Sequence, residues 1–160
     1  MLEITKLVTG TDDLTLEEAK TFMRVDFDEE DELITNLISQ ARNLIEVYTN
    51  RSLIESGVIA VLSARKEYIP SYGPVYLIVD LKDKDGNAVD YEWDGLKLTF
   101  KTKDTLTLRY DTKPDNTFGL MLGWKETVSY LYENRADTSN IGLILYYNQN
   151  LMPFRRSIWI

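Results

Sequence analysis

Apolar residues recur along one stripe of the segment between Asp28 and Thr49. The stripe consists of Leu33, Ile34, Leu37, Ile38, Ala41, Leu44, Ile45 and Tyr48. Spacings of three, four and seven residues place these side chains on one face of an α-helix. A helix that begins at Asp28 or Glu29 and ends at Tyr48 or Thr49 would be about 30 Å long, which is the width of a small domain. We therefore expect the rest of the chain to pack on this stripe.

A shorter helix is predicted immediately before the long one. Thr15 and Glu18 have the spacing of a capping box, in which each side chain bonds the backbone N–H of the other residue. The predicted helix covers Leu16–Arg24, and Val25–Phe27 forms a short break before the long helix. Together these segments make a helix pair over residues 15–52.

The hydrophobic period changes to that of β-strands between Gly57 and Thr112. Short alternating or β-branched runs are found at Val58–Leu62, Val75–Leu81, Ala88–Trp93, Leu96–Lys101 and Leu106–Tyr110. Asp85-Gly86 and Asp94-Gly95 are typical of tight hairpin turns. The pattern predicts an antiparallel meander of four or five strands over residues 57–112, inserted between helical segments.

Helical spacing returns near Thr117 and continues to about Asn134. Its apolar stripe consists of Leu120, Met121, Trp124, Val128, Leu131 and Tyr132. Ile141–Tyr147 fits either a short strand or a short helix, and residues 136–160 form a C-terminal tail. We predict a single domain over residues 1–160 of the α+β class. Its mainly helical core, made by the helix pair and the helix over residues 117–135, carries an inserted small antiparallel β-sheet.

The composition excludes several kinds of chemistry. The 160 residues include no cysteine and no histidine, which removes disulfides, thiolate metal sites and the commonest general base. GxSxG, GxxxxGK[ST] and GxGxxG motifs are absent, so neither serine-hydrolase chemistry nor nucleotide binding is supported. There is no apolar run of about 18 residues and no N-terminal secretory signal. We expect a cytoplasmic protein that is not an enzyme, has no cofactor and contacts no membrane.

The net charge of −8 is unevenly distributed along the chain. Residues 1–52 carry most of the excess of carboxylates, whereas residues 117–160 are slightly basic. This distribution argues against a general DNA-binding surface, which needs clustered lysine and arginine. It fits a solvated acidic surface, and it also permits head-to-tail electrostatic matching between copies of the chain.

The segment Asp26–Glu32 is strongly acidic. Its alternate carboxylates resemble the start of an EF-hand loop, but Asp31 replaces the required glycine and Leu37 stands where the bidentate glutamate should be. We interpret the cluster as the capped start of the long helix, where the helix dipole favours carboxylates. Four of its members are candidate interface residues, namely Asp28, Glu29, Glu30 and Asp31.

The C-terminal tail combines large apolar side chains with arginine. It contains Phe154, Arg155, Arg156, Ile158, Trp159 and Ile160. Chain ends are usually polar unless something holds them. Such a terminus resembles an interface hot spot, although it could instead fold back on the core of its own chain. The candidate interface residues here are Phe154, Arg155, Arg156 and Trp159, together with Arg135 at the end of the preceding helix.

The aromatic residues, 10 Tyr, 3 Trp and 5 Phe, leave a ligand-binding alternative open. Tyr91 and Trp93 alternate on a predicted strand, as aromatic side chains do in modules that stack on bases or sugars. Asp90, Glu92 and Asp94 flank them, whereas nucleic-acid modules place basic side chains there. Packing is the better interpretation, and a small carbohydrate- or ligand-binding module stays as an alternative.

The helical segments resemble a known family, the head–tail connector (adaptor, or head-completion) family of long-tailed phages and prophages. The matching residues of the first segment are Leu16, Glu18, Ala19, Lys20, Arg24, Val25, Asp26, Asp31, Leu33, Ile34, Leu37, Ile38, Ala41, Arg42, Ile45, Glu46, Tyr48, Thr49 and Arg51. Val128–Arg135 (VSYLYENR) resembles the second signature helix of the family, and Leu151–Arg156 resembles its closing segment. The inserted sheet matches the variable part of the family in its position and in the turn at Asp83–Gly86.

The resemblance implies a structural subunit that binds other proteins and does not catalyse. Family members form a ring, typically of twelve copies in the virion, under the portal protein at the capsid vertex. The ring extends the DNA channel and supports a stopper or tail-completion protein, with the helical core in ring contacts and the C-terminal segment on the portal or a neighbour. We therefore expect a protein of the virion neck that assembles in the host cytoplasm.

DNA is expected to pass through such a channel without sequence-specific binding. An acidic wall would suit this passage because it repels the phosphate backbone, so part of Asp26–Glu32 is expected to face the lumen or a partner. One alternative is another ring-forming neck component, such as a stopper or tail-completion protein. A stopper would be mainly a β-barrel, so helix content separates the two.

Overall fold

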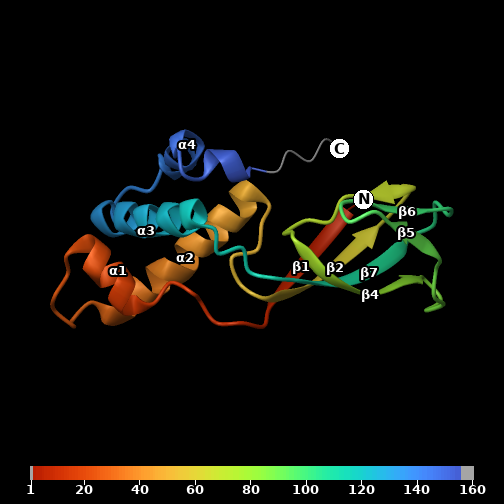
Figure 1. Ribbon diagram of the computed structural model, residues 1–160, viewed down its shortest axis with the longest axis horizontal. Helices are drawn as coiled ribbons and strands as arrows, with labels where there is room; N and C mark the ends of the chain where they lie inside the picture. The colour runs from red at the N-terminus through yellow and green to blue at the C-terminus, as the bar shows by residue number, and fades with distance from the viewer. Residues whose placement is uncertain (1, 156–160) are drawn as a thin grey trace. The chain divides into compact units, whose positions relative to one another are not determined.

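A computed structural model describes residues 2–155 of the chain. The chain divides into two compact units, each built from two separate stretches of sequence. The sheet unit contains residues 2–11 and 54–114, and the helical unit contains residues 12–53 and 115–155 (Figure 1). Both helical segments predicted from the sequence therefore lie in one unit.

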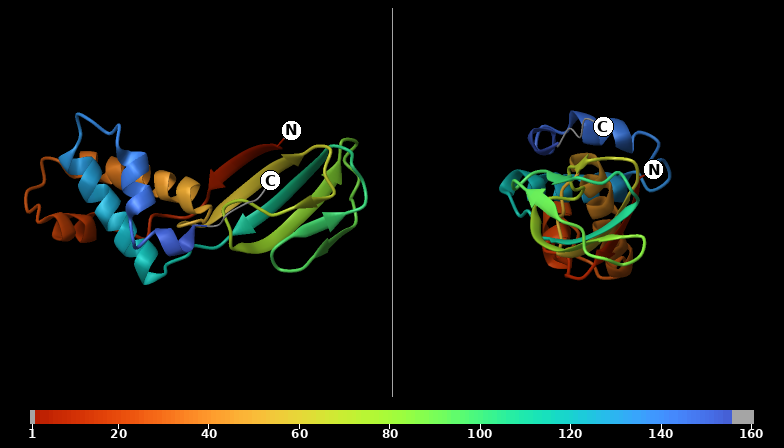
Figure 2. Two further views of the ribbon diagram at one scale, coloured as in Figure 1. Left: turned by 90° about the horizontal axis from the view of Figure 1, so that it is seen from above. Right: turned by 90° about the vertical axis from the view of Figure 1, so that its right-hand side faces the viewer.

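The helical unit contains four α-helices and one short 3-10 helix within the described residues. These are α1 (Leu16–Met23), α2 (Asp31–Thr49), α3 (Phe118–Glu133), α4 (Ile141–Tyr147) and η1 (Met152–Phe154). In this unit α1 and α4 lie on opposite sides of α3 (Figures 1 and 2). The ambiguous segment Ile141–Tyr147 is a helix, and the predicted α+β class is confirmed.

The helical core is built from the apolar stripes of α2 and α3. The stripe residues that lie in one buried cluster are Ile34, Leu37, Ile38, Ala41, Ile45, Leu120, Trp124, Val128 and Leu131. Trp124 is fully buried, and its indole N–H donates a hydrogen bond to the carbonyl oxygen of Ile38 at 2.9 Å. A large side chain whose one polar atom is satisfied therefore joins the two helices.

The two N-terminal helices begin differently. α1 begins with the predicted capping box, since the Thr15 hydroxyl accepts the Glu18 N–H at 3.2 Å and the Glu18 carboxylate accepts the Thr15 N–H at 3.1 Å. α2 begins at Asp31, later than predicted. The residues before it form a turn, closed by a 3.2 Å hydrogen bond from the Asp31 N–H to the Asp28 carbonyl.

The sheet unit contains two antiparallel sheets. The larger has the strand order β1-β2-β7-β4, made by β1 (Leu2–Val8), β2 (Ser56–Leu62), β7 (Leu106–Thr112) and β4 (Val75–Asp83). The smaller has the order β3-β6-β5, made by β3 (Glu67–Tyr68), β6 (Leu98–Phe100) and β5 (Tyr91–Trp93). Figure 2 shows the four strands of the larger sheet side by side.

The sheet is antiparallel, as predicted, but the predicted meander is wrong about which strands are neighbours and about how many strands there are. β4 pairs with β7 and not with the next strand along the chain, so that Leu81 lies opposite Leu108. The N-terminal segment, for which no strand was expected, pairs with β2 from Leu2 to Val8. Alternation shows which side chains face a core, but it does not identify the neighbouring strand.

Both predicted Asp-Gly turns are present. Gly86 and Gly95 have backbone φ angles of +87° and +94°, in the left-handed region that favours glycine. The preceding carboxylates of Asp83 and Asp94 each accept two backbone N–H groups at 2.7–2.9 Å. These backbone hydrogen bonds hold the pKa of both carboxyl groups below its ordinary value.

An ion pair crosses from β7 to β4 on the larger sheet. Arg109 donates from Nε to Asp80 Oδ1 at 2.9 Å, and a second guanidinium nitrogen bonds the other carboxylate oxygen. The hydrogen bonds from Arg109 lower the pKa of Asp80 to about 2.

Replacing Arg109 with methionine should remove a stabilisation that depends on pH. Because the pKa of Asp80 is lower in the folded state than its unfolded value of about 3.9, the pair stabilises the fold above about pH 4 and loses this effect as the pH falls towards 2. Arg109 is half-exposed, so solvent screens the pair and the expected loss near pH 6 is small but measurable. Urea unfolding of both proteins near pH 6 and near pH 3 measures the difference. A difference that stays constant between the two pH values would contradict this assignment.

Candidate interface surfaces of the helical unit

The acidic leader, defined as Asp26–Glu32, is the first candidate surface. Lys20 of α1 reaches into it, with Nζ 2.7 Å from the Asp28 carboxylate and 2.6 Å from that of Asp31. These hydrogen bonds, the one from Asp28 first, raise the pKa of Lys20. Glu29 is exposed and has no ion pair or hydrogen bond in the described part of the chain. Two of the four predicted interface carboxylates thus connect α1 with the start of α2.

Glu30 connects the acidic leader to the end of α3. Its carboxylate accepts a hydrogen bond from the Tyr132 hydroxyl and pairs with Arg135 at 2.7 Å. The bond from Tyr132, followed by that from Arg135, holds the pKa of Glu30 below its ordinary value. The Glu30 side chain makes no cap bond to α2, so the capping interpretation is wrong for this residue. Glu30 and Arg135, which are both predicted interface residues, therefore bind each other within the same chain.

Replacing Glu30 with alanine should loosen the turn before α2. The Tyr132 and Arg135 contacts are the links from this turn to α3, so the backbone amides of residues 27–31 should exchange with solvent faster in the variant. Hydrogen–deuterium exchange measures this directly. Glu29→Ala is the matched control because Glu29 has no such partner, and equal exchange in the two variants would show that the Glu30 contacts do not hold the turn.

Phe154 in the tail packs on its own unit. Its ring covers Gly119 of α3, where an added Cβ would lie 2.8 Å from the ring edge. Arg51 donates from Nε to the Phe154 carbonyl at 3.0 Å, and its guanidinium carbon lies 5.6 Å from the ring centroid. Phe154 is half-buried as a result, so a partner would reach only part of its ring.

Arg155 is the other described candidate of the tail. It is exposed, and its guanidinium carbon lies 5.6 Å from the ring centroid of Tyr48 on α2. Arg156 and Trp159 lie outside the described residues. An interface role for the candidates of the tail and of the acidic leader stays a prediction.

Polar residues of the family-like segment stabilise the end of α2. Glu46 is only 2% exposed, and its carboxylate accepts the backbone N–H of Leu53 at 2.8 Å. Arg51 bonds the carboxylate of Asp115 at 2.5 Å, which joins the end of the first stretch of the helical unit to the beginning of the second. Arg42 is also buried. Sequence spacing did not indicate these roles, because the partners are not neighbours on the same helix face.

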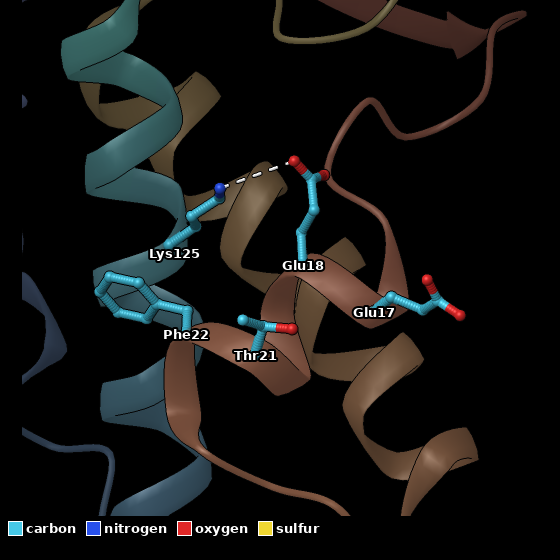
Figure 3. Close-up of a pocket in the computed structure, with 5 residues that line it drawn as sticks. All are labelled: Glu17, Glu18, Thr21, Phe22 and Lys125. Carbon is cyan, nitrogen blue, oxygen red and sulfur yellow. Dashed lines mark ion pairs between the residues drawn. The ribbon is translucent and has the colours of Figure 1, made fainter.

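A shallow groove of about 330 Å³ lies between α1 and α3 (Figure 3). It is lined by Glu17, Glu18, Thr21, Phe22 and Lys125. The Lys125 ammonium lies 3.7 Å from the Glu18 carboxylate, and Figure 3 shows Glu17 pointing away from this pair. Phe22 is 40% exposed. An apolar ring beside a charged rim is a combination that is common in contact surfaces between proteins.

α4 presents an apolar surface on the other side of α3. Leu145 is its one buried residue, whereas Leu143 and Tyr147 are 59% and 74% exposed. A hollow of about 590 Å³ lies beside them, and its wall includes Glu126, whose carboxylate accepts hydrogen bonds from Asn148 and Asn150. Exposed apolar groups that lie together in this way are a feature that protein contact surfaces often have.

The described residues offer neither a cluster of metal ligands nor a membrane-spanning helix. Residues 2–155 contain no group of three or more His, Cys, Asp or Glu side chains arranged to hold a metal ion. In the same part of the chain, every helix is too short or too polar to cross a membrane. What the helical unit presents at its surface is charged pairs and exposed apolar side chains.

Solved structures share this fold over nearly the whole chain. A chain described as "Neck of empty GTA particle computed with C6 symmetry" is 17% identical, with a TM-score of 0.74, and the match covers 100% of this chain and 97% of that chain. A chain of "Virion of native gene transfer agent (GTA) particle" is 18% identical with a TM-score of 0.72, at the same coverage. A third, "Neck of native GTA particle computed with C12 symmetry", is 15% identical with a TM-score of 0.63 and covers 96% and 97% of the two chains.

The sequence itself also matches a family. No curated protein sequence matches the chain. The family model described as "Phage gp6-like head-tail connector protein" matches residues 13–158, which include both helical segments and the inserted sheet. Because this match covers most of the sequence, the protein belongs to the phage gp6-like head-tail connector family.

Proposed function

We propose that this protein is a ring-forming subunit of the neck of a phage or phage-like particle, where the head joins the tail. The observation that carries the proposal is the match of residues 13–158 to the connector family. The full-length similarity to chains from gene transfer agent necks supports it, since those necks were computed with C6 or C12 symmetry. The ring would hold twelve copies or a related number.

In this proposal the ring lies under the portal protein, extends the DNA channel and supports a stopper or tail-completion protein. The α4 surface suits a protein partner because exposed Leu143 and Tyr147 lie beside a hollow. The half-buried Phe154 and the exposed Arg155 follow it in sequence and extend the same end of the chain. Contact with the portal or stopper would bury these groups.

The helix content favours a connector over a stopper, which would be mainly β-barrel. The four α-helices include one of 19 residues and one of 16 residues, and they form a core of their own. The carbohydrate-binding alternative gains no support, because Trp93 packs against the core of the sheet unit and leaves Tyr91 as the exposed ring of the pair.

Deleting the gene for this protein in cells that produce the particles tests the proposal. If the protein joins head to tail, cells without it should accumulate heads and free tails, and supplying the wild-type protein should restore complete particles. Electron microscopy of negatively stained lysates gives the readout. Complete tailed particles in normal yield without the protein would overturn the proposal.

A further inference from the structure

Two loops of the sheet unit bring four basic residues to one end of the larger sheet. This basic loop cluster consists of Arg65 and Lys66, between β2 and β3, and Lys101 and Lys103, between β6 and β7. The Phe100 N–H donates to the Lys66 carbonyl at 2.9 Å, which holds the two loops together. The hydroxyls of Ser63 and Thr105 form a second link at 3.1 Å.

The charges of the cluster are not neutralised within the described chain. Lys66, Lys101 and Lys103 are exposed and form no ion pair there, whereas Lys20, Lys82, Lys97 and Lys125 each have a carboxylate partner. The Nε atom of Arg65 is buried without a hydrogen-bond partner. The one carboxylate within these loops is Asp104, which is bonded to the Thr102 hydroxyl at 2.7 Å. These two loops therefore carry a net positive charge on a chain whose net charge is −8.

That net charge constrains any ring. Copies that each carry −8 repel one another, and a contact that places opposite charges face to face offsets this repulsion. A cyclic ring also needs two different patches on each subunit, one for each neighbour. A cationic patch and an anionic patch on the same chain meet both conditions.

The acidic leader offers the matching carboxylates. Lys20 pairs with both Asp28 and Asp31, and Arg135 pairs with Glu30. Its other three acidic members, Asp26, Glu29 and Glu32, are exposed and form no ion pair in the described residues. We propose that the basic loop cluster of one copy binds these three carboxylates of a second copy, and that this adds a contact between neighbours in the ring to those of the helical core. The inference rests on the proposed ring function and assigns a task to the inserted sheet.

Duplex DNA is the competing partner for a cationic loop cluster. Its phosphates would attract the same side chains, but the net charge of −8 opposes the approach of a polyanion to the chain. Reversing the charge of both patches distinguishes the two partners. If the cluster binds the carboxylates of a neighbour, reversing their charge as well restores the attraction. If it binds DNA, the phosphates stay negative and the attraction is not restored.

A charge exchange in producing cells tests the contact. One variant carries Lys101→Glu and Lys103→Glu, and the other carries Asp26→Lys and Glu29→Lys. Each variant alone places like charges at every ring contact and should lower the yield of tailed particles about tenfold or more. When the two are produced together, each patch meets an opposite charge in an alternating ring, and the yield should return to near the wild-type value.

Controls separate the contact from folding. Lys101→Arg with Lys103→Arg keeps the charge and should leave the yield unchanged. Lys113→Glu reverses a lysine at the opposite end of β7, stacked 3.8 Å from the Tyr76 ring, and should also have little effect. Circular dichroism of the purified variants checks that each one is folded.

The result also distinguishes this inference from the proposed function. Wild-type yield from either folded variant alone, or no recovery when both are produced, would overturn the contact while the tailless phenotype of the deletion stands. The variant with Lys101→Glu and Lys103→Glu could instead produce heads that lose DNA, without rescue by the variant with Asp26→Lys and Glu29→Lys. That result would show that the cluster binds DNA and that the inference is wrong. In wild-type particles, zero-length crosslinking should give dimers that join Lys101 or Lys103 to Asp26, Glu29 or Glu32.

Discussion

Replacing Trp124 with alanine is expected to unfold the helical unit or leave it barely stable. The side chain is fully buried between α2 and α3, and its indole N–H bonds the Ile38 carbonyl. Truncation of a buried tryptophan costs about 3–5 kcal/mol, which is a large part of the total stability of about 5–15 kcal/mol that an ordinary domain has. Urea unfolding followed by far-ultraviolet circular dichroism measures the loss.

The variant Trp124→Phe separates the two contributions of this residue. Phenylalanine keeps a ring in the core but removes the hydrogen bond and part of the volume, so we expect a loss of about 1–3 kcal/mol. A Trp124→Ala protein that retains wild-type stability within about 1 kcal/mol would show that the α2–α3 contact is not the centre of this core.

Gly123 is the second position where a small change should have a large effect. It immediately precedes Trp124 in α3, and a Cβ added there would lie 2.6 Å from Cγ of Leu151, a fully buried residue. Alanine favours a helix over glycine by about 1 kcal/mol, but the overlap with Leu151 should cost more than that. We expect Gly123→Ala to lower stability by about 1–3 kcal/mol.

Two companion variants test the cause of this loss. With Leu151→Ala already present, Gly123→Ala should cost far less, because the clashing side chain is gone. Gly142→Ala in α4 is the matched control, since nothing lies within 4 Å of its added Cβ, and it should raise stability by up to about 1 kcal/mol. Equal effects at Gly123 and Gly142 in urea unfolding would contradict the close packing of Leu151 on α3.

The two glycines of α3 illustrate a limit of sequence reasoning. From the sequence, Gly119 and Gly123 only weaken a helix, since both lie near its beginning. The structure places Phe154 over Gly119 and Leu151 over Gly123, so their small size is what lets the C-terminal segment pack on α3. Helical period predicts which face of a helix is apolar, but not which distant segment approaches it.

The charged residues show the same limit more strongly. Charge patterning correctly placed carboxylates in the first turn of α2, where Asp31 and Glu32 lie. It did not indicate that Tyr132 and Arg135 hold Glu30, because that bond joins residues more than one hundred positions apart. The basic loop cluster was also missed, since the sequence separates Arg65 and Lys66 from Lys101 and Lys103, and the pairing of β3 with β6 brings their loops together.

The strongly periodic parts were predicted well for a physical reason. Both long helices bury one continuous stripe, and a stripe is a local property of the sequence. Strand order in the larger sheet depends on contacts between distant segments, as in the pairing of β2 with β7, and local alternation does not encode it. The candidate interface depends on partners that are separate molecules, which is a further step from the sequence.

A cryo-electron microscopy reconstruction of the particle neck tests the central claim most directly. If this protein is the connector, a ring of density between the portal and the tail should fit its helical and sheet units, with one copy for each subunit of the ring. The basic loop cluster of each copy should then face the acidic leader of its neighbour. A neck whose density is fully explained by other proteins, or a particle in which this chain lies elsewhere, would contradict the account.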